Sequence, residues 1–135
     1  MIPGKRQGCY LITQDILAKA SDIISKVDVG TCNLFIQHTS ASISVNENAD
    51  PDVRSDLRHI YQTLVPFREE YNHKFEGEDD MPAHALASIV GPSVTIPIRR
   101  GKLMFGTWQG IYLNEHRDFG GDRKIVVTVM GSASK

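Results

Sequence analysis

The chain has 135 residues, 41% of them hydrophobic, and a formal net charge of −1. This length suits one domain with one core, so we treat residues 1–135 as a single domain. The charge supplies no basic field for nucleic acid, and no apolar run approaches the roughly 20 residues that span a bilayer. The first residues lack the apolar stretch of a secretory signal, so we expect a soluble, cytoplasmic protein with neither nucleic acid nor membrane as partner.

The predicted elements of the first third are a helix and two strands. Residues 1–7 read as an irregular tail. Apolar residues then recur at helical spacing over residues 11–27, where Thr13 can cap the helix. Strands follow at residues 31–37 and 43–45, and the small polar crossover between them begins at His38.

The middle of the chain predicts two helices separated by a loop. Asp50 is a suitable N-cap with Pro51 at the first helical position, and an apolar stripe runs on to residue 64. The acidic stretch 67–80 is expected to form a surface loop. Pro82 suits the first turn of a third helix that ends at Val90, before Gly-Pro.

The last third is mainly strand. Strands are predicted at residues 94–98, 103–108, 111–115 and 124–129, and Pro97 implies an edge strand or a bulge. Helices and strands mix without regular βαβ alternation. The pattern therefore favours the α+β class, a mostly antiparallel sheet arrangement with three helices.

Three histidines lie in short polar motifs near the ends of predicted elements. His38 precedes a run of hydroxyl residues, His84 follows two aspartates, and His116 lies between acidic and basic residues. Imidazole is the commonest metal ligand and titrates near neutral pH. Because the three are widely spaced in sequence, we expect them to meet in one metal or acid–base centre.

The neighbours of these histidines have two interpretations each. Thr39 and Ser40 can cradle an anion such as phosphate or stabilise a turn. Glu47 can bind a cation or cap the next helix. Asp79 and Asp80 can ligate a metal, with Asp80 one helical turn from His84, or form a solvated acidic loop.

Other conspicuous residues are given simpler roles. Trp108 either lines the floor of a binding pocket, where it would stack on a planar ring of a ligand, or belongs to the core. His59 and His73 are assigned to solvent. Cys9 and Cys32 lack the spacing of a thiolate zinc site and are expected to be reduced, structural cysteines.

Taken together, these motifs resemble the YjbQ-like family, also called the secondary thiamine-phosphate synthase family. The resemblance runs from about Gly8 to Gly131 and rests on five motifs in order, which occupy residues 37–42, 46–51, 79–84, 106–110 and 115–118. Members usually begin with an additional strand. Here only seven residues precede Gly8, so we expect that strand to be missing or truncated.

The resemblance implies a compact α+β domain, a homotrimer, and a metal-binding histidine cluster made of His38, His84 and His116. It also implies a weak thiamine-phosphate synthase activity, which joins a pyrimidine methyl diphosphate to a thiazole phosphate and releases diphosphate. In that reaction a divalent metal, zinc or magnesium, would neutralise the leaving group.

Roles in that chemistry follow from motif position and residue type. The three histidines and Glu47 are the catalytic candidates, and Glu47, Asp79 and Asp80 are candidate ligands of a second, magnesium-type site. The substrate-binding candidates are Thr39, Ser40 and Arg117 for phosphate and Trp108 for the pyrimidine. Two alternatives stay open: a metal-dependent hydrolase or lyase on a small phosphorylated metabolite, and a non-catalytic trimeric module that binds a metal or ligand.

Overall fold

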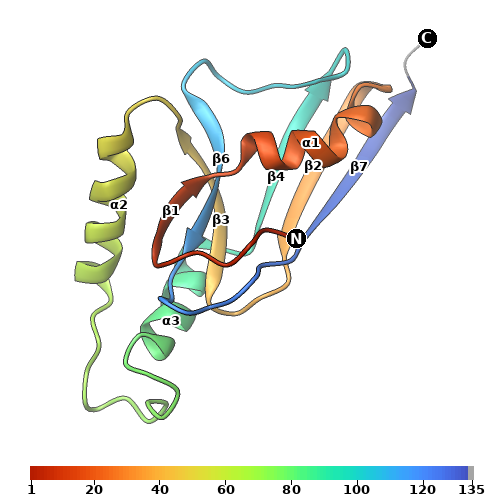
Figure 1. Cartoon of the computed structure of the whole chain (residues 1–135). Helices are drawn as coiled ribbons and strands as arrows, with labels where there is room; N and C mark the ends of the chain where they lie inside the picture. Colours follow the sequence, from red (N-terminus) through yellow and green to blue (C-terminus); the bar gives the residue numbers. More distant parts are fainter. Residues whose placement is uncertain (134–135) are drawn as a thin grey trace.

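A computed structural model, which describes residues 1–133, contains two antiparallel sheets and three helices (Figure 1). The smaller sheet has three strands in the order β1 (Gly8–Leu11), β6 (Gln109–Glu115), β3 (Ala41–Glu47). The larger has the order β5 (Lys102–Leu103), β4 (Ser93–Arg99), β2 (Val27–Ile36), β7 (Ile125–Ala133). The chain is thus a single compact α+β domain, as predicted.

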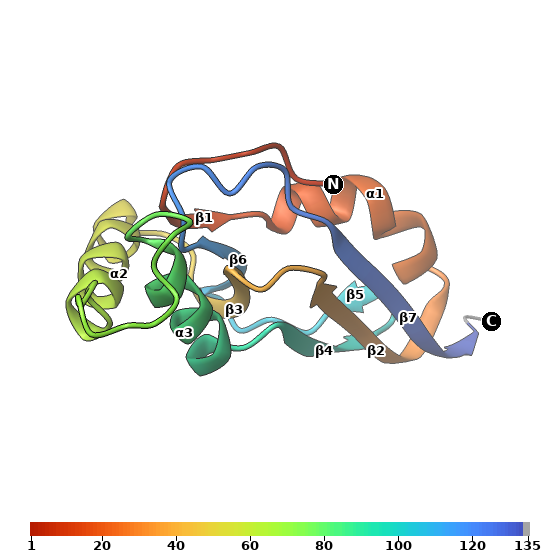
Figure 2. The same cartoon turned by 90° about the horizontal axis from the view of Figure 1, so that it is seen from below.

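The helices lie on different sides of the sheets. They are α1 (Thr13–Ile24), α2 (Pro51–Leu64) and α3 (Asp80–Val90). Figures 1 and 2 show α1 across the larger sheet, with α2 beside β1 and α3 at the end of the smaller sheet where β3 begins. None of these helices is long and apolar enough to cross a bilayer, as far as the described residues extend.

The core is rich in isoleucine and lies between the two sheets and α1. Its buried members come from α1, β2, β3, β4 and β6, for example Ile16, Leu34, Ile43, Ile96 and Leu113. β-Branched side chains such as those of Ile43 and Ile96 pack well on pleated surfaces, which favours strands at these positions. The core fixes both sheets and so positions the loops at their ends.

The predicted starts and ends of α2 and α3 are largely confirmed, but the first helix is shorter than the predicted 11–27, because Leu11 ends the unpredicted strand β1 and Val27 begins β2. The Asp50 side chain accepts a hydrogen bond from Asp52 N at 2.9 Å, with Pro51 at the first helical position. Gly91 follows α3 with φ 105°. Thr13, however, does not cap α1, because its hydroxyl accepts a hydrogen bond from Ile111 N at 2.9 Å and so joins the helix to β6.

Two strand predictions need correction. Pro97 lies in β4, which is not an edge strand, opposite Thr31 of β2. Its carbonyl accepts from Met104 N, on the side where only the two-residue β5 borders β4, so the missing N–H costs no bond to β2. Residues 104–108 form no strand, because Gly106 and Gln109 close a turn through Gln109 N to Gly106 O.

The N-terminal segment is ordered by contacts rather than by a strand. Ile2 is buried and forms one isolated antiparallel bridge with Arg123, with both backbone hydrogen bonds made. Gly4 N also donates to Asp122 Oδ1 at 2.7 Å. The predicted tail therefore holds the loop before β7 in place.

Both cysteines are buried free thiols, which agrees with the predicted reduced, structural role. Cys9 lies in β1 and Cys32 in β2. Burial raises the pKa of Cys9 to about 11, and it also raises the pKa of Cys32. Thiols in this state are poor nucleophiles and poor metal ligands at neutral pH.

Candidate functional site

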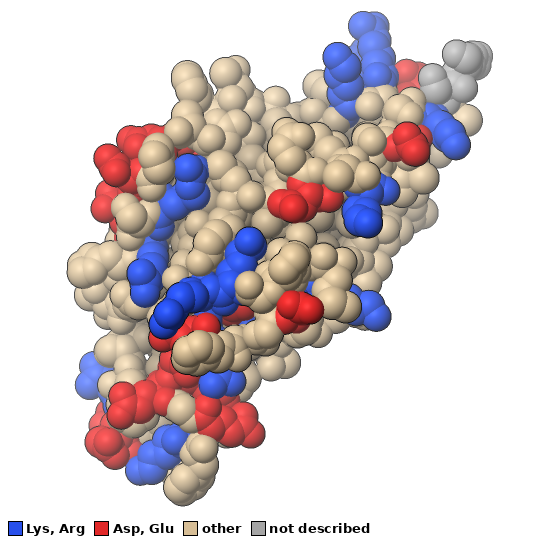
Figure 3. All heavy atoms as spheres, viewed as in Figure 1, with Lys and Arg blue, Asp and Glu red and all other residues tan. Residues whose placement is uncertain are grey.

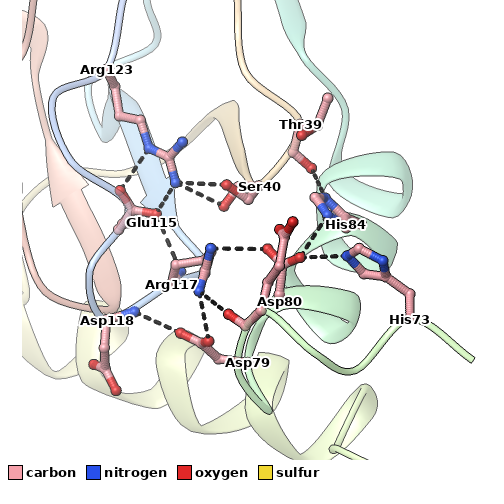
Figure 4. A network of polar contacts seen from close by, with 11 residues as sticks. Thr39, Ser40, His73, Asp79, Asp80, His84, Glu115, Arg117, Asp118 and Arg123 are labelled. Atoms are coloured by element: carbon pink, nitrogen blue, oxygen red, sulfur yellow. Dashed lines mark hydrogen bonds and ion pairs between the residues drawn. The ribbon is translucent and has the colours of Figure 1, made fainter. Parts of the chain in front are cut away.

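Asp80, the first residue of α3, is the centre of a polar cluster (Figure 4). Its Oδ2 lies 3.1 Å from His84 Nε2, one helical turn along, and 2.6 Å from His73 Nε2 in the preceding loop. Its Oδ1 lies 3.0 Å from Arg117 Nη1. The Asp80 residue is only 2% exposed, so three side chains from separate segments converge on one buried carboxylate.

The surrounding charges keep that carboxylate ionised. Burial raises the pKa of Asp80, but the hydrogen bond from His73 and the charges of His84 and Arg117 outweigh it and hold the pKa below its ordinary value. Asp80 therefore presents a negative charge to both imidazoles at neutral pH.

The hydrogen bond made by Nδ1 of His84 determines whether its Nε2, the nitrogen that faces Asp80, carries a hydrogen. Nδ1 lies 2.9 Å from the carbonyl oxygen of Thr39, which can only accept, so Nδ1 carries a hydrogen. A neutral ring then turns a bare Nε2 toward the carboxylate, lone pair against lone pair. This contact is favourable only when a proton or a metal ion lies between the two groups.

The donor set fits a divalent metal. One ligand atom each from His73, Asp80 and His84 lie within 4.8 Å of one another. Ligands about 2.1 Å from a common tetrahedral ion lie roughly 3.4 Å apart. The 3.1 Å between Asp80 and His84 is close to this separation, and the 2.6 Å between Asp80 and His73 would lengthen when an ion binds. Two imidazoles with one carboxylate suit zinc or another transition metal better than magnesium. The Thr39 carbonyl supplies the outer hydrogen bond that orients a ligating histidine.

Asp79 acts as a brace beside this cluster. Its Oδ2 accepts from Asp118 N at 2.9 Å and its Oδ1 lies 3.4 Å from Arg117 Nη2, which also donates to Glu76 O (Figure 4). Both carboxylate oxygens of Asp79 are thus engaged with protein donors. It ties the start of α3 to the loop after β6.

A second brace lies deeper in the same region. Arg123 makes a two-pronged ion pair with Glu115, at 2.7 and 2.5 Å, and donates to the Ser40 hydroxyl at 2.9 Å. Arg123 and Glu115 are both at most 3% exposed. The Ser40 hydroxyl is therefore occupied by Arg123, and this ion pair fixes the loop whose Thr39 carbonyl orients His84.

His38 lines a pocket shared with His84. Its Nε2 accepts a hydrogen bond from the backbone N–H of Lys124 at 2.8 Å, so this nitrogen is already engaged. Burial lowers the pKa of His38, and the charge of Arg123 lowers it further. The pocket, about 490 Å³, opens between the β2–β3 loop and α3.

His116 lies apart from the cluster within the protomer. It is 2% exposed, its Nε2 is 2.9 Å from the Ser42 hydroxyl, and its ring meets that of Tyr61 edge to face. Burial lowers the pKa of His116 to about 4, with help from Arg123, so the ring is neutral. Here it is part of the packing under α2.

Glu47 and Trp108 are at the opposite end of β3 from Thr39. Six strand steps from Ala41 to Glu47 correspond to about 20 Å. The Glu47 carboxylate accepts from the backbone N–H groups of Ala49 and Asp50, and Trp108 is 64% exposed. Within one protomer these two residues do not meet the histidine cluster.

The loop between α2 and α3, residues 65–79, is largely exposed, as predicted, and Figure 3 shows its acidic side chains gathered at the lower left. Asp80, which the prediction included in this surface loop, is instead buried at the start of α3. His73 in this loop was assigned to solvent. Its side chain is 46% exposed, yet its Nε2 reaches Asp80. Sequence spacing does not reveal this, because a loop has no periodicity to relate His73 to a residue seven positions later.

Comparisons place the chain among known proteins. The family model described as "UPF0047 protein YjbQ-like" matches residues 1–132. A UPF0047 protein YjbQ of Escherichia coli O157:H7 is 43% identical, covering 96% of this chain and 94% of its own. One of Salmonella typhimurium is 46% identical, covering 94% and 91%.

Solved structures agree. A YjbQ/UPF0047 family protein of Clostridium acetobutylicum matches with a TM-score of 0.83 at 35% identity over 96% of both chains. A protein of Sulfolobus solfataricus matches with a TM-score of 0.84 at 27% identity, covering 97% of this chain and 93% of that one. The fold defines a small α+β protein with a polar cluster at one end of its sheets. The chain belongs to the YjbQ-like UPF0047 family.

Proposed function

We propose that the protein is a metal-dependent enzyme that acts on a small phosphorylated metabolite. The observation that carries this is the buried Asp80 carboxylate with two imidazole nitrogens at 2.6 and 3.1 Å. That arrangement needs a positive charge between the carboxylate and the imidazoles. It also adjoins a pocket, because His84 is one of the residues that line it. A divalent ion bound there would supply charge neutralisation for a phosphate or diphosphate group.

The chain's own residues prepare the site for such an ion. His73, Asp80 and His84 would hold it, and Thr39 fixes the His84 ring through its carbonyl. Arg117 forms an ion pair with the second carboxylate oxygen of Asp80. Since these groups are tied to two loops and a helix, little reorganisation accompanies the build-up of charge on a leaving group.

The specific reaction we propose is that of a thiamine-phosphate synthase. The diphosphate of a pyrimidine methyl diphosphate leaves as the thiazole nitrogen forms a new carbon–nitrogen bond. The resemblance to the family and the candidate metal-binding cluster of His73, Asp80 and His84 support this proposal. Because Trp108 lies far from the cluster within one protomer, stacking on a substrate bound there would require Trp108 of a neighbouring copy. A homotrimer, which the same resemblance implies, would allow this.

A second candidate is a metal-dependent hydrolase. Three protein ligands are the number found in catalytic zinc sites, which keep a further position open for water or substrate. In that case the reaction transfers a phosphoryl group to water and forms no carbon–nitrogen bond.

Product analysis separates the candidates. Zinc-loaded protein is incubated with the pyrimidine diphosphate and the thiazole phosphate, and products are identified by mass spectrometry. We expect the joined thiamine phosphate plus diphosphate, and their loss in His84→Ala. Dephosphorylated substrates alone would support the hydrolase. Binding of substrate without any turnover, in protein that carries its metal, would contradict both and support a binding module.

A further inference from the structure

The pocket beside the metal cluster has its own set of hydrogen-bond donors. His84 and Ser88, one helical turn apart on α3, face His38 and Thr39 of the β2–β3 loop across it. The floor is made of small or rigid residues, Ala41, Ala87 and Pro92. A group bound there would therefore lie beside the candidate metal, because His84 belongs to both.

The hydrogen bond from Lys124 fixes the form of the His38 ring. A backbone N–H can only donate, so Nε2 of His38 is unprotonated, and the neutral ring carries its hydrogen on Nδ1. Within residues 1–133 this Nδ1–H has no hydrogen-bond partner on the protein. His38 is therefore a neutral N–H donor held in a set orientation, with no nitrogen available for a metal.

We propose that this pocket binds a phosphoryl oxygen of the substrate, and that His38 is a phosphate-binding residue rather than a metal ligand. The Thr39 and Ser88 hydroxyls complete the donor set, since both residues line the pocket and are exposed. Three neutral donors beside a cation suit a tetrahedral oxyanion. The inference rests on the proposed function for the identity of the ligand as a phosphorylated metabolite.

Two substitutions at His38 separate its two hydrogen bonds. His38→Gln places a carbonyl oxygen near the former Nε2, which can still accept from Lys124 N–H, but removes the Nδ1 donor. His38→Asn retains an N–H near the former Nδ1 and loses the acceptor. A purely structural role predicts that His38→Gln behaves as the wild type, whereas a phosphate-binding role predicts that it is the more damaging change for binding.

The experiment is a titration of zinc-loaded protein with inorganic phosphate, in which binding is measured by calorimetry or phosphorus NMR. We expect His38→Gln to raise the Kd for phosphate about tenfold and to leave the zinc content unchanged. His38→Asn should bind phosphate more tightly than His38→Gln. The matched control, His59→Gln on the exposed side of α2, should bind as the wild type does.

Nitrogen NMR of the His38 ring gives a second, independent measurement, because protonated and bare imidazole nitrogens have distinct chemical shifts. We expect a protonated Nδ1 and a bare Nε2 at neutral pH. Wild-type phosphate affinity in His38→Gln, loss of zinc in that variant, or the opposite tautomer would each overturn the inference. Turnover and zinc content in the wild type test the proposed function separately, so either idea can fail while the other holds.

Discussion

Asp80 is the residue on which the candidate metal centre depends, because both imidazoles approach the same oxygen of its side chain. An amide at this position would keep the size of the group and lose its charge. Asp80→Asn should reduce bound zinc from about one ion per chain to near zero, as measured by elemental analysis after dialysis. Asp56→Asn, an exposed change on α2, is the control. Full zinc content in Asp80→Asn would rule out this carboxylate as a ligand.

His116 predicts a pH dependence of stability. Its pKa is lowered from 6.5 to about 4 in the fold, so between these values the unfolded chain binds more protons than the folded one. The free energy of unfolding therefore falls as the pH is lowered from 6.5 toward 4, by about 3 kcal/mol in all.

The measurement is urea unfolding at several pH values in wild type and His116→Gln. A glutamine can still accept from the Ser42 hydroxyl but does not titrate, so the variant should show a smaller loss of stability across this range. Identical pH profiles for the two proteins would mean that His116 is not the group responsible.

Residue-level prediction succeeded where regular geometry relates two positions. Asp80 and His84 are one helical turn apart, and this spacing indicated correctly that they share a helix face. His73 reaches the same carboxylate from a loop, and Arg123 reaches Glu115 and Ser40 across two loops. Contacts of this kind depend on tertiary structure, which sequence spacing does not encode.

At the scale of elements, the buried ion pair of Arg123 and Glu115 holds the two loops beside the site in place. These are the β2–β3 loop, through Ser40, and the loop before β7, which contains Arg123. Arg123→Met would leave the buried Glu115 charge without a cationic partner, with only the hydrogen bond from the Arg117 backbone N–H, and should destabilise the fold by about 3–5 kcal/mol. Thermal or chemical unfolding checks this, with the exposed Arg68→Met as a control.

The double variant Glu115→Gln, Arg123→Met sharpens that test. Because the double variant also removes the buried negative charge of Glu115, it should recover part of the stability lost in Arg123→Met alone. A double variant less stable than the single one would contradict the assignment of the cost to an unpaired carboxylate.

Element prediction was accurate for α2 and α3 and less so for the first helix, for β1 and for strand ends. The N-cap at Asp50 and the apolar stripe that follows are local signals, and α2 begins where they indicate. β2 and β7 extend beyond the predicted strands, because each pairs with the other over nearly its whole length. A pairing partner can extend a strand into residues such as Gly30 that do not favour it.

For the whole molecule, the larger sheet carries apolar side chains on the face turned away from the core. Val29, Phe35 and Met130 are 59%, 44% and 68% exposed in the single chain. Together with the family resemblance, this face supports the proposed homotrimer, since assembly would cover it.

Light scattering should give a mass three times that of one chain. Met130→Glu would place a charge on the apolar face and should shift the protein toward monomers, whereas Lys19→Glu, an exposed change on α1, should not. A wild-type protein that is monomeric at micromolar concentration would contradict the trimer.

The proposed enzyme depends on a cation bound between His73, Asp80 and His84. Anomalous scattering from zinc-loaded crystals, measured on both sides of the zinc absorption edge, tests it most directly. We predict one strong peak per chain at about 2.1 Å from Nε2 of both histidines and from an oxygen of Asp80. A peak coordinated by His38 or His116 instead, or no peak in this cluster, would contradict the assignment.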